Sequence, residues 1–115
     1  LESAALAVAE VAESAVVPVV DDIKGVVIDL YVSLKPGFEA SEEIVQKIIE
    51  VLVAEIGPIA KPRKVWIVPD MPRSRGGRII RRVLASITNN TDFGGISTLS
   101  NPDVVKFIQK QVMSR

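Results

Sequence analysis

Two β-branched runs, joined by a short polar turn, constrain the fold of this chain more than any other feature. The runs AESAVVPVVD (12–21) and VVIDLYVSLK (26–35) are typical of strands, and DDIKG (21–25) predicts the turn between them. Pro18 has no N–H for a sheet ladder, so the first run is predicted to form an edge strand or a bulge. Alternating apolar residues of the second run should share one face of the sheet: Ile28, Leu30, Val32 and Leu34.

Helical patterns lie on both sides of these strands. Residues 1–9 are alanine-rich and suit a short helix. Ser41 is a predicted N-cap, and the apolar residues after it form a stripe typical of a helix from 42 to about 56. Gly57 and Pro58 should end this helix.

The second half of the chain predicts a third strand and two more helices. Residues 63–71 (RKVWIVPDM) suit the strand, and residues from about 78 to 87 suit a helix. Asn101, followed by Pro102, is predicted to cap a last amphipathic helix. The order of elements predicts an α/β (α+β) fold, with helices packed on a small sheet of about three main strands, and a single domain over residues 1–115.

The composition excludes several classes of function. The 115 residues contain neither cysteine nor histidine, which excludes disulfides, thiolate ligands, histidine-based catalysis and the commonest zinc ligand. The 14 basic and 14 acidic side chains cancel, so no overall field favours nucleic acid or an anionic membrane. Acids and lysines interrupt each apolar stretch before the ~20 residues needed to span a bilayer. We therefore expect no nucleic acid and no membrane among the partners, and no metal site in this chain.

Positive charge is concentrated in one stretch, PRSRGGRIIRR, which spans residues 72–82. Gly76 and Gly77 permit positive φ angles and a close approach of the backbone to a ligand. A helix that starts directly after them would point its N–H groups at an anion. Three arginines near the glycines would then hold a phosphate or a carboxylate: Arg73, Arg75 and Arg78. An exposed basic surface without a ligand is the alternative interpretation.

The longer segment MPRSRGGRIIRRVL resembles the last signature motif of the acyl-adenylate-forming enzymes, the superfamily of acyl-CoA synthetases, luciferases and peptide-synthetase adenylation domains. Their pattern is Leu-Pro-Lys-Thr-Arg-Ser-Gly-Lys-Ile-x-Arg-Arg. Arg75 and Gly77 match it, Gly76 replaces the serine, and Arg78 stands where the catalytic lysine is expected. The tail GGISTLSNPDVV is similar to Gly-Asp-x-Ser-Thr-Leu-x-Asp-Pro-x-Val-Val of the AMP-forming acetyl-CoA synthetases.

The resemblance covers the whole chain and implies that residues 1–115 are the mobile C-terminal lid domain of an acetate–CoA ligase. Enzymes of this family join a carboxylic acid to ATP and then transfer the acyl group from the adenylate to CoA. ATP, CoA and Mg²⁺ would be bound together with an N-terminal catalytic domain outside this chain, and acetate is the expected acid. We expect the isolated fragment to be inactive and the parent enzyme to be cytoplasmic.

The resemblance also implies roles for six residues. Three are expected in the loop that enters the active site for adenylation: Arg78 in place of the family lysine, Gly77 and Gly76. Three are expected to bind the nucleotide cofactors: Arg75, Arg63 and Lys61. For the last two, the contact would be with a phosphate of CoA; the other interpretation is that Lys61, Arg63 and Lys64 form a charge cluster on an edge strand.

Departures from the family pattern leave other interpretations open. Arg78 keeps the positive charge, but its guanidinium is planar and bulkier than an ammonium group. Val53 and Val8 stand where relatives carry a basic residue and a histidine. A degenerate, non-catalytic relative that acts as an interaction or regulatory module is therefore the alternative. A small nucleic-acid binder is disfavoured by the neutral net charge and by the lack of interleaved aromatic residues, and Trp66 is predicted to be a core residue.

Overall fold

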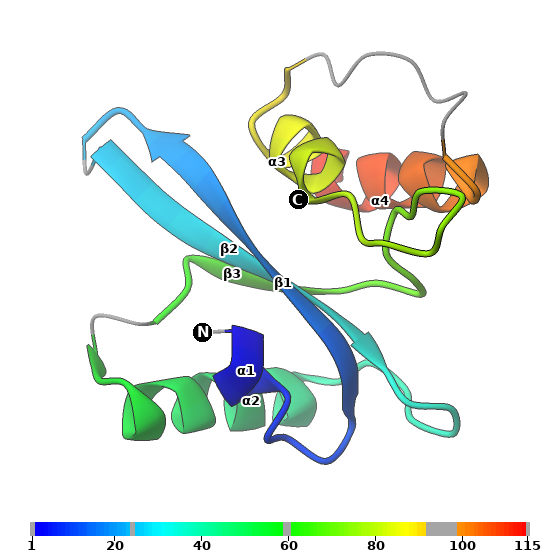
Figure 1. Ribbon diagram of the computed structural model, residues 1–115. Helices are drawn as coiled ribbons and strands as arrows, with labels where there is room; N and C mark the ends of the chain where they lie inside the picture. Colours follow the sequence, from blue (N-terminus) through cyan, green and yellow to red (C-terminus); the bar gives the residue numbers. More distant parts are fainter. Residues whose placement is uncertain (1, 24, 59–60, 92–98, 115) are drawn as a thin grey trace. The chain divides into compact units, whose positions relative to one another are not determined.

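Figure 1 shows the computed structural model, which describes residues 2–23, 25–58, 61–91 and 99–114. Its elements follow in the order α1 (Glu2–Ala5), β1 (Val11–Asp21), β2 (Gly25–Leu34), α2 (Glu42–Glu55), β3 (Lys64–Ile67), α3 (Arg81–Thr88) and α4 (Pro102–Met113). They divide into two compact units, residues 1–68 and 69–115. The small sheet with its helices confirms the predicted α/β class. No helix in the described ranges is long and apolar enough to cross a membrane.

The sheet of the first unit is mixed, with the strand order β1-β2-β3. β1 and β2 form an antiparallel hairpin that closes where Asp21 pairs with Gly25. In the turn, the Asp21 carboxylate accepts a hydrogen bond from the N–H of Ile23 (2.8 Å). β1 lies at an edge of the sheet, as Pro18 predicts. β3 runs parallel to β2, and α2 makes the crossover that a parallel pair requires.

Helix α2 supplies the core on one face of this sheet. Ser41 is its N-cap, as predicted, because the Ser41 hydroxyl accepts a hydrogen bond from the N–H of Ile44 (3.3 Å). α1 lies on the same face of the sheet as α2 (Figure 1) and buries Ala5 in the same core. One stripe of α2 packs on alternating residues of β2: Ile44, Ile48 and Leu52 with Leu30 and Val32. The predicted apolar face of β2 is therefore confirmed for Leu30 and Val32, and Leu34 is partly buried against the same core.

The other face of β2 carries Asp29 and Tyr31, which are both fully buried. Tyr31 stacks on Trp66 of β3, with 6.2 Å between the ring centroids and 20° between the ring planes. The indole N–H of Trp66 donates a hydrogen bond to the Asp29 carboxylate (2.9 Å). Trp66 is therefore a core residue whose polar atom has a partner, which confirms the role predicted for it.

In the second unit, α3 and α4 pack on each other. The buried apolar residues of the two helices are Val83, Leu84 and Ile87 in α3, and Val105, Ile108 and Val112 in α4. Asn101 occupies the N-cap position of α4 and Pro102 begins the helix, as predicted. The Asn101 side chain, however, makes no capping hydrogen bond. This part of the prediction is wrong because the amide binds a distant segment of the chain instead.

Three elements are shorter than predicted. α1 ends at Ala5, β3 spans only Lys64–Ile67, and α3 begins at Arg81. β3 ends early because Pro69 has no N–H with which to continue the ladder. α3 begins late because residues 73–79, which include the first two residues of the predicted helix, fold into a hairpin.

Candidate functional site

Residues 73–79, which we call the motif hairpin, hold the predicted catalytic residues at a tight turn. The two ends of the segment pair in an antiparallel bridge. Ser74 closes the loop twice, since its N–H donates to the carbonyl of Arg78 and its own carbonyl accepts from the N–H of Gly77, both at 2.9 Å. Gly77 has a φ of 87°, as expected for the last residue of a three-residue hairpin loop. The turn therefore presents residues 75–78, all of them exposed, at one tip.

The two glycines of the tip differ in backbone conformation. Gly77 has a positive φ, whereas Gly76 does not. A Cβ atom added to Gly77 would meet nothing within 4 Å, and one added to Gly76 would meet only the Ser74 hydroxyl, at 3.8 Å. Space is available at both positions, so the backbone conformation alone makes Gly77 the more demanding residue.

Replacing Gly77 by alanine is expected to lower the free energy of unfolding by about 1 kcal/mol, because an L residue is strained in the left-handed region. Gly76→Ala is the matched control, and we expect it to stay within about 0.5 kcal/mol of the wild type. Urea unfolding of the 115-residue chain compares the two variants. Equal losses of stability would contradict the distinction between the glycines.

Arg78 lies at the end of the loop with its side chain exposed. Its N–H donates to the Ser74 hydroxyl (3.3 Å), so Ser74 holds the Arg78 backbone through both its main chain and its side chain. Within residues 2–23, 25–58, 61–91 and 99–114, no hydrogen bond or ion pair engages the Arg78 guanidinium. Its fork of N–H donors is therefore available to a phosphate or a carboxylate.

Arg73, a third candidate ligand for the same anion, is engaged at the base of the hairpin. Its Nε and Nη2 atoms donate to one carboxylate oxygen of Asp70 (3.2 and 3.0 Å), and its Nη1 atom donates to the carbonyl of Gly77 (3.1 Å). Partial burial acts to raise the pKa of Asp70, but the N–H of Met71 and the Arg73 guanidinium hold that pKa below its ordinary value. Arg73 therefore stabilises the hairpin, while Arg75 and Arg78 are the exposed cations of its tip.

The start of α3 does not form the anion site expected beside the glycines. The N-cap residue is Ile80, and its N–H donates to the carbonyl of Pro72 (2.8 Å). The hairpin separates Gly77 from Arg81, the first residue of the helix. The expectation that the helix begins directly after the glycine pair is therefore wrong, and the hairpin tip itself is the candidate site.

The residues predicted to bind CoA lie in the first unit, around a hollow of about 250 Å³. Its lining comes from α2 and from the segment that leads into β3: Glu42, Val45, Ile49, Lys61, Pro62, Arg63, Lys64 and Val65. The structure thus brings Lys61 and Arg63 to the same hollow. The Lys64 ammonium lies 5.0 Å from the centroid of the Trp66 ring, within reach of a cation–π interaction.

Arg63 forms a two-pronged ion pair with Asp29. Its Nε and Nη2 atoms donate to the two carboxylate oxygens at 2.8 and 2.7 Å. The Asp29 side chain is fully buried, whereas 39% of the Arg63 side chain is exposed. The hydrogen bonds with Asp29 raise the pKa of Arg63. One edge of the guanidinium is therefore occupied, and the exposed part remains accessible.

The two positions at which the resemblance led us to expect polar residues are apolar in this chain. Val8 is buried in the core of the first unit, with 3% of its surface exposed. Val53 lies half-buried on α2. In the part of the chain that the structure describes, no group of three or more acidic, histidine or cysteine residues could hold a metal ion.

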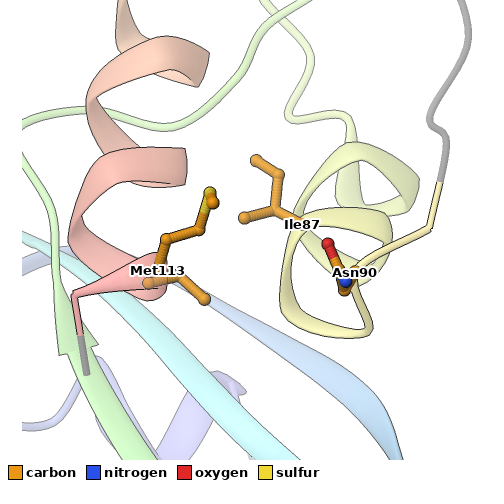
Figure 2. Close-up of a pocket in the computed structure, with 4 residues that line it drawn as sticks. Ile87, Asn90 and Met113 are labelled. Carbon is orange, nitrogen blue, oxygen red and sulfur yellow. The ribbon is translucent and has the colours of Figure 1, made fainter.

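A second hollow, of about 270 Å³, lies between α3 and α4 (Figure 2). Ile87 and Met113 face each other across it, and Asn90 and Val112 complete the described lining. Asn90 has a φ of 57°. None of these four residues is ionisable, so the described part of the lining offers no charge for a nucleotide or a carboxylate.

Sequence reasoning missed two acids that organise these sites. Asp29 anchors Arg63 and Trp66, and Asp70 anchors Arg73. A charged residue in the middle of an otherwise apolar strand was the available signal for Asp29. For Asp70, the signal was its spacing of three residues from Arg73.

Comparison with known proteins assigns this chain to a family. Residues 1–78 match the family described as the AMP-binding enzyme C-terminal domain, and the chain therefore belongs to this family. An acetyl-coenzyme A synthetase of Bdellovibrio bacteriovorus is 43% identical over 117 residues, which cover 100% of this chain and 18% of the relative. A second one, from Halorhodospira halophila, is 41% identical over 91% of this chain and 17% of its own length. The chain thus spans less than a fifth of the length of the curated relatives it matches.

Solved structures support the same assignment. An acyl-CoA synthetase of Brucella canis is similar over 72% of this chain and 15% of its own chain, with a TM-score of 0.65 and 32% sequence identity. The acetoacetyl-CoA synthetase of Streptomyces lividans covers 99% of this chain, and 17% of its own chain is matched, with a TM-score of 0.78. At 21% identity, this second likeness shows the fold alone.

Proposed function

We propose that this chain is the C-terminal domain of an AMP-forming acetate–CoA ligase and that the motif hairpin enters the active site for adenylation. The observation that carries the proposal is the exposed guanidinium of Arg78, which no described residue engages, at a hairpin tip shaped by Gly77. Relatives named acetyl-coenzyme A synthetases support acetate as the acid. The proposed partner is an N-terminal catalytic domain, and we call the polypeptide that contains both domains the parent ligase.

The proposed reaction has two steps. In the first, a carboxylate oxygen attacks the α-phosphorus of ATP, and pyrophosphate leaves with the electron pair of the broken P–O bond. In the second, the thiolate of CoA attacks the acyl carbon, and AMP leaves. Arg78 would stabilise the negative charge that develops on the transferred oxygens in the first step. Rotation of the domain would then withdraw Arg78 and bring another face to the CoA site.

The other basic residues receive binding roles in this proposal. Arg75, at the same tip as Arg78, would contact phosphate oxygens of the nucleotide. Lys61 and Arg63 would contact a phosphate of CoA, because the described lining of their hollow holds three basic side chains and one acid, Glu42, and Asp29 pairs with one of the three. We propose that Mg²⁺ binds with ATP in the N-terminal domain, since the described residues offer no acidic cluster for it. A cytoplasmic location is proposed on the basis of the family alone.

The arginine at position 78 favours a second candidate function. A pocket shaped for the compact ammonium of lysine is a poor fit for a planar guanidinium. A parent protein with impaired adenylation would act as an interaction or regulatory module, which is the alternative to an active ligase.

Exchange of labelled pyrophosphate into ATP by the parent ligase distinguishes an active ligase from a non-catalytic module. Because the first step is reversible, an active ligase should exchange pyrophosphate into ATP when acetate is present. If acetate is the preferred acid, exchange should fall with propionate and longer acids. The isolated 115-residue chain is the control and should give none, since the relatives that it matches are more than five times as long. A folded parent protein that binds ATP but gives no exchange with any acid would support the non-catalytic alternative.

A further inference from the structure

We infer that Asn101, at the start of α4, is a positioning residue that holds the base of the motif hairpin and so fixes where Arg78 is presented. This inference rests on the proposed function of Arg78. It concerns a residue outside the hairpin, 23 positions further along the sequence.

The Asn101 amide binds the segment that leads into the hairpin. Its Oδ1 atom accepts a hydrogen bond from the N–H of Arg73 (2.9 Å). Its Nδ2 atom donates to the carbonyl of Met71 (2.7 Å) and to a carboxylate oxygen of Asp70 (3.3 Å). The amide therefore uses both its acceptor and its donors on three residues of one segment, Asp70, Met71 and Arg73. It does so although it occupies the N-cap position of a helix.

In this chain an amide makes the contact, at a position where the acetyl-CoA synthetase pattern has an aspartate. A carboxylate at position 101 would lose the two donated hydrogen bonds and would place a second negative charge close to Asp70. A serine hydroxyl is too short to bond both the Arg73 N–H and the Met71 carbonyl, but it is a good helix N-cap. Only the amide satisfies all three groups, which separates the positioning role from a capping role.

The residues beside Asn101 reinforce this connection. The N–H of Ser100 donates to the carbonyl of Arg73 (2.9 Å), and Leu99 forms an antiparallel bridge with Ser74. Arg73 is thus held through its N–H, its carbonyl and its guanidinium. Ser74, the next residue, makes the hydrogen bonds that fix the backbone of Arg78.

These contacts form a continuous path from α4 to the tip of the hairpin. Loss of the Asn101 amide would release the N–H of Arg73 and the carbonyl of Met71, and would let the base of the hairpin move. Misplacement of a catalytic group by about 1 Å costs up to roughly 10²-fold in rate, so even a small movement should be measurable. The proposed effect acts on Arg78 through position and not through contact with substrate.

The experiment compares Asn101→Ala and Asn101→Ser in the parent ligase. We expect both to lower acetate-dependent ATP–pyrophosphate exchange by about tenfold or more, mainly in kcat, with little change in the KM for ATP. Asn101→Ser should retain the thermal stability that an N-cap provides to α4. Ser114→Ala is the matched control, since it removes a hydrogen bond at the other end of α4 (Ser114 hydroxyl to the Lys110 carbonyl), and exchange should be unchanged.

A double-mutant cycle tests whether Asn101 acts through Arg78. Once Arg78 is alanine, Asn101→Ala should lower exchange by less than about twofold further, because the group that it positions is gone. Wild-type exchange in Asn101→Ser, or full multiplication of the two single effects, would overturn the inference and leave the role of Arg78 intact. Unchanged exchange in Arg78→Ala alone would overturn the proposed function, and this inference with it.

Discussion

Replacing Arg78 by alanine in the parent ligase should lower acetate-dependent ATP–pyrophosphate exchange by about 10²- to 10³-fold. This range is typical for removal of one group that stabilises developing charge on transferred oxygens. Transfer of the acyl group from supplied acetyl-adenylate to CoA should change much less, because Arg78 is proposed to leave the site before that step. Measuring both half-reactions on the same preparation makes the comparison internal.

Arg78→Lys tests the departure from the family pattern at the same position. Lysine carries a compact ammonium on a thin side chain, so we expect this variant to exceed the wild type in pyrophosphate exchange. Arg82→Lys, the same substitution on an exposed residue of α3, is the control and should leave exchange unchanged. If Arg78→Lys gave no gain, the hypothesis that the guanidinium weakens adenylation would fail.

The largest expected loss of stability follows from Arg63→Ala. This substitution leaves the fully buried Asp29 carboxylate without its ion-pair partner. Breaking a buried pair by removing one partner typically costs about 3–5 kcal/mol, and we expect about 3 kcal/mol because Arg63 is partly exposed. Urea unfolding of the 115-residue chain measures the loss.

Two further variants test whether the broken ion pair causes the loss of stability in Arg63→Ala. Lys61→Ala removes a neighbouring basic residue of the same hollow without touching Asp29, and its effect should stay within about 0.5 kcal/mol. Replacing both members of the pair by apolar residues, as Asp29→Leu with Arg63→Met, should cost less than Arg63→Ala alone. Similar losses for Arg63→Ala and Lys61→Ala would show that the ion pair contributes little.

Much of the first unit could be predicted because its elements follow local rules. Alternation in β2, the β-branched run of β1 and the Ser41 cap each depend on residues close together in the sequence. The start of α3 could not be predicted in this way. Ile79 and Ile80 continue a helical pattern, but Gly77 and the cross-loop hydrogen bonds of Ser74 favour a hairpin there.

The candidate site was predictable where the motif named it and not where distant residues support it. Gly77 and Arg78 could be identified from a contiguous stretch of sequence. Asp29 and Arg63 are 34 residues apart, and Asn101 lies 28 residues after Arg73. Asn101 was predicted to cap its own helix because that is the usual local use of asparagine. Its amide serves the hairpin instead, and no local pattern distinguishes these two uses.

The pair formed by Asp29 and Arg63 also bears on how the shortest strand finds its place. β3 has only four residues, and apolar side chains alone would hold such a strand in more than one alignment. Arg63 directly precedes it, and Lys64 lies opposite Asp29. Sliding β3 by one residue would turn Trp66 to the opposite side of the sheet and break its hydrogen bond with Asp29. In the present alignment the buried Asp29 carboxylate has both Arg63 and Trp66 as partners, so this single acid favours that alignment of β3.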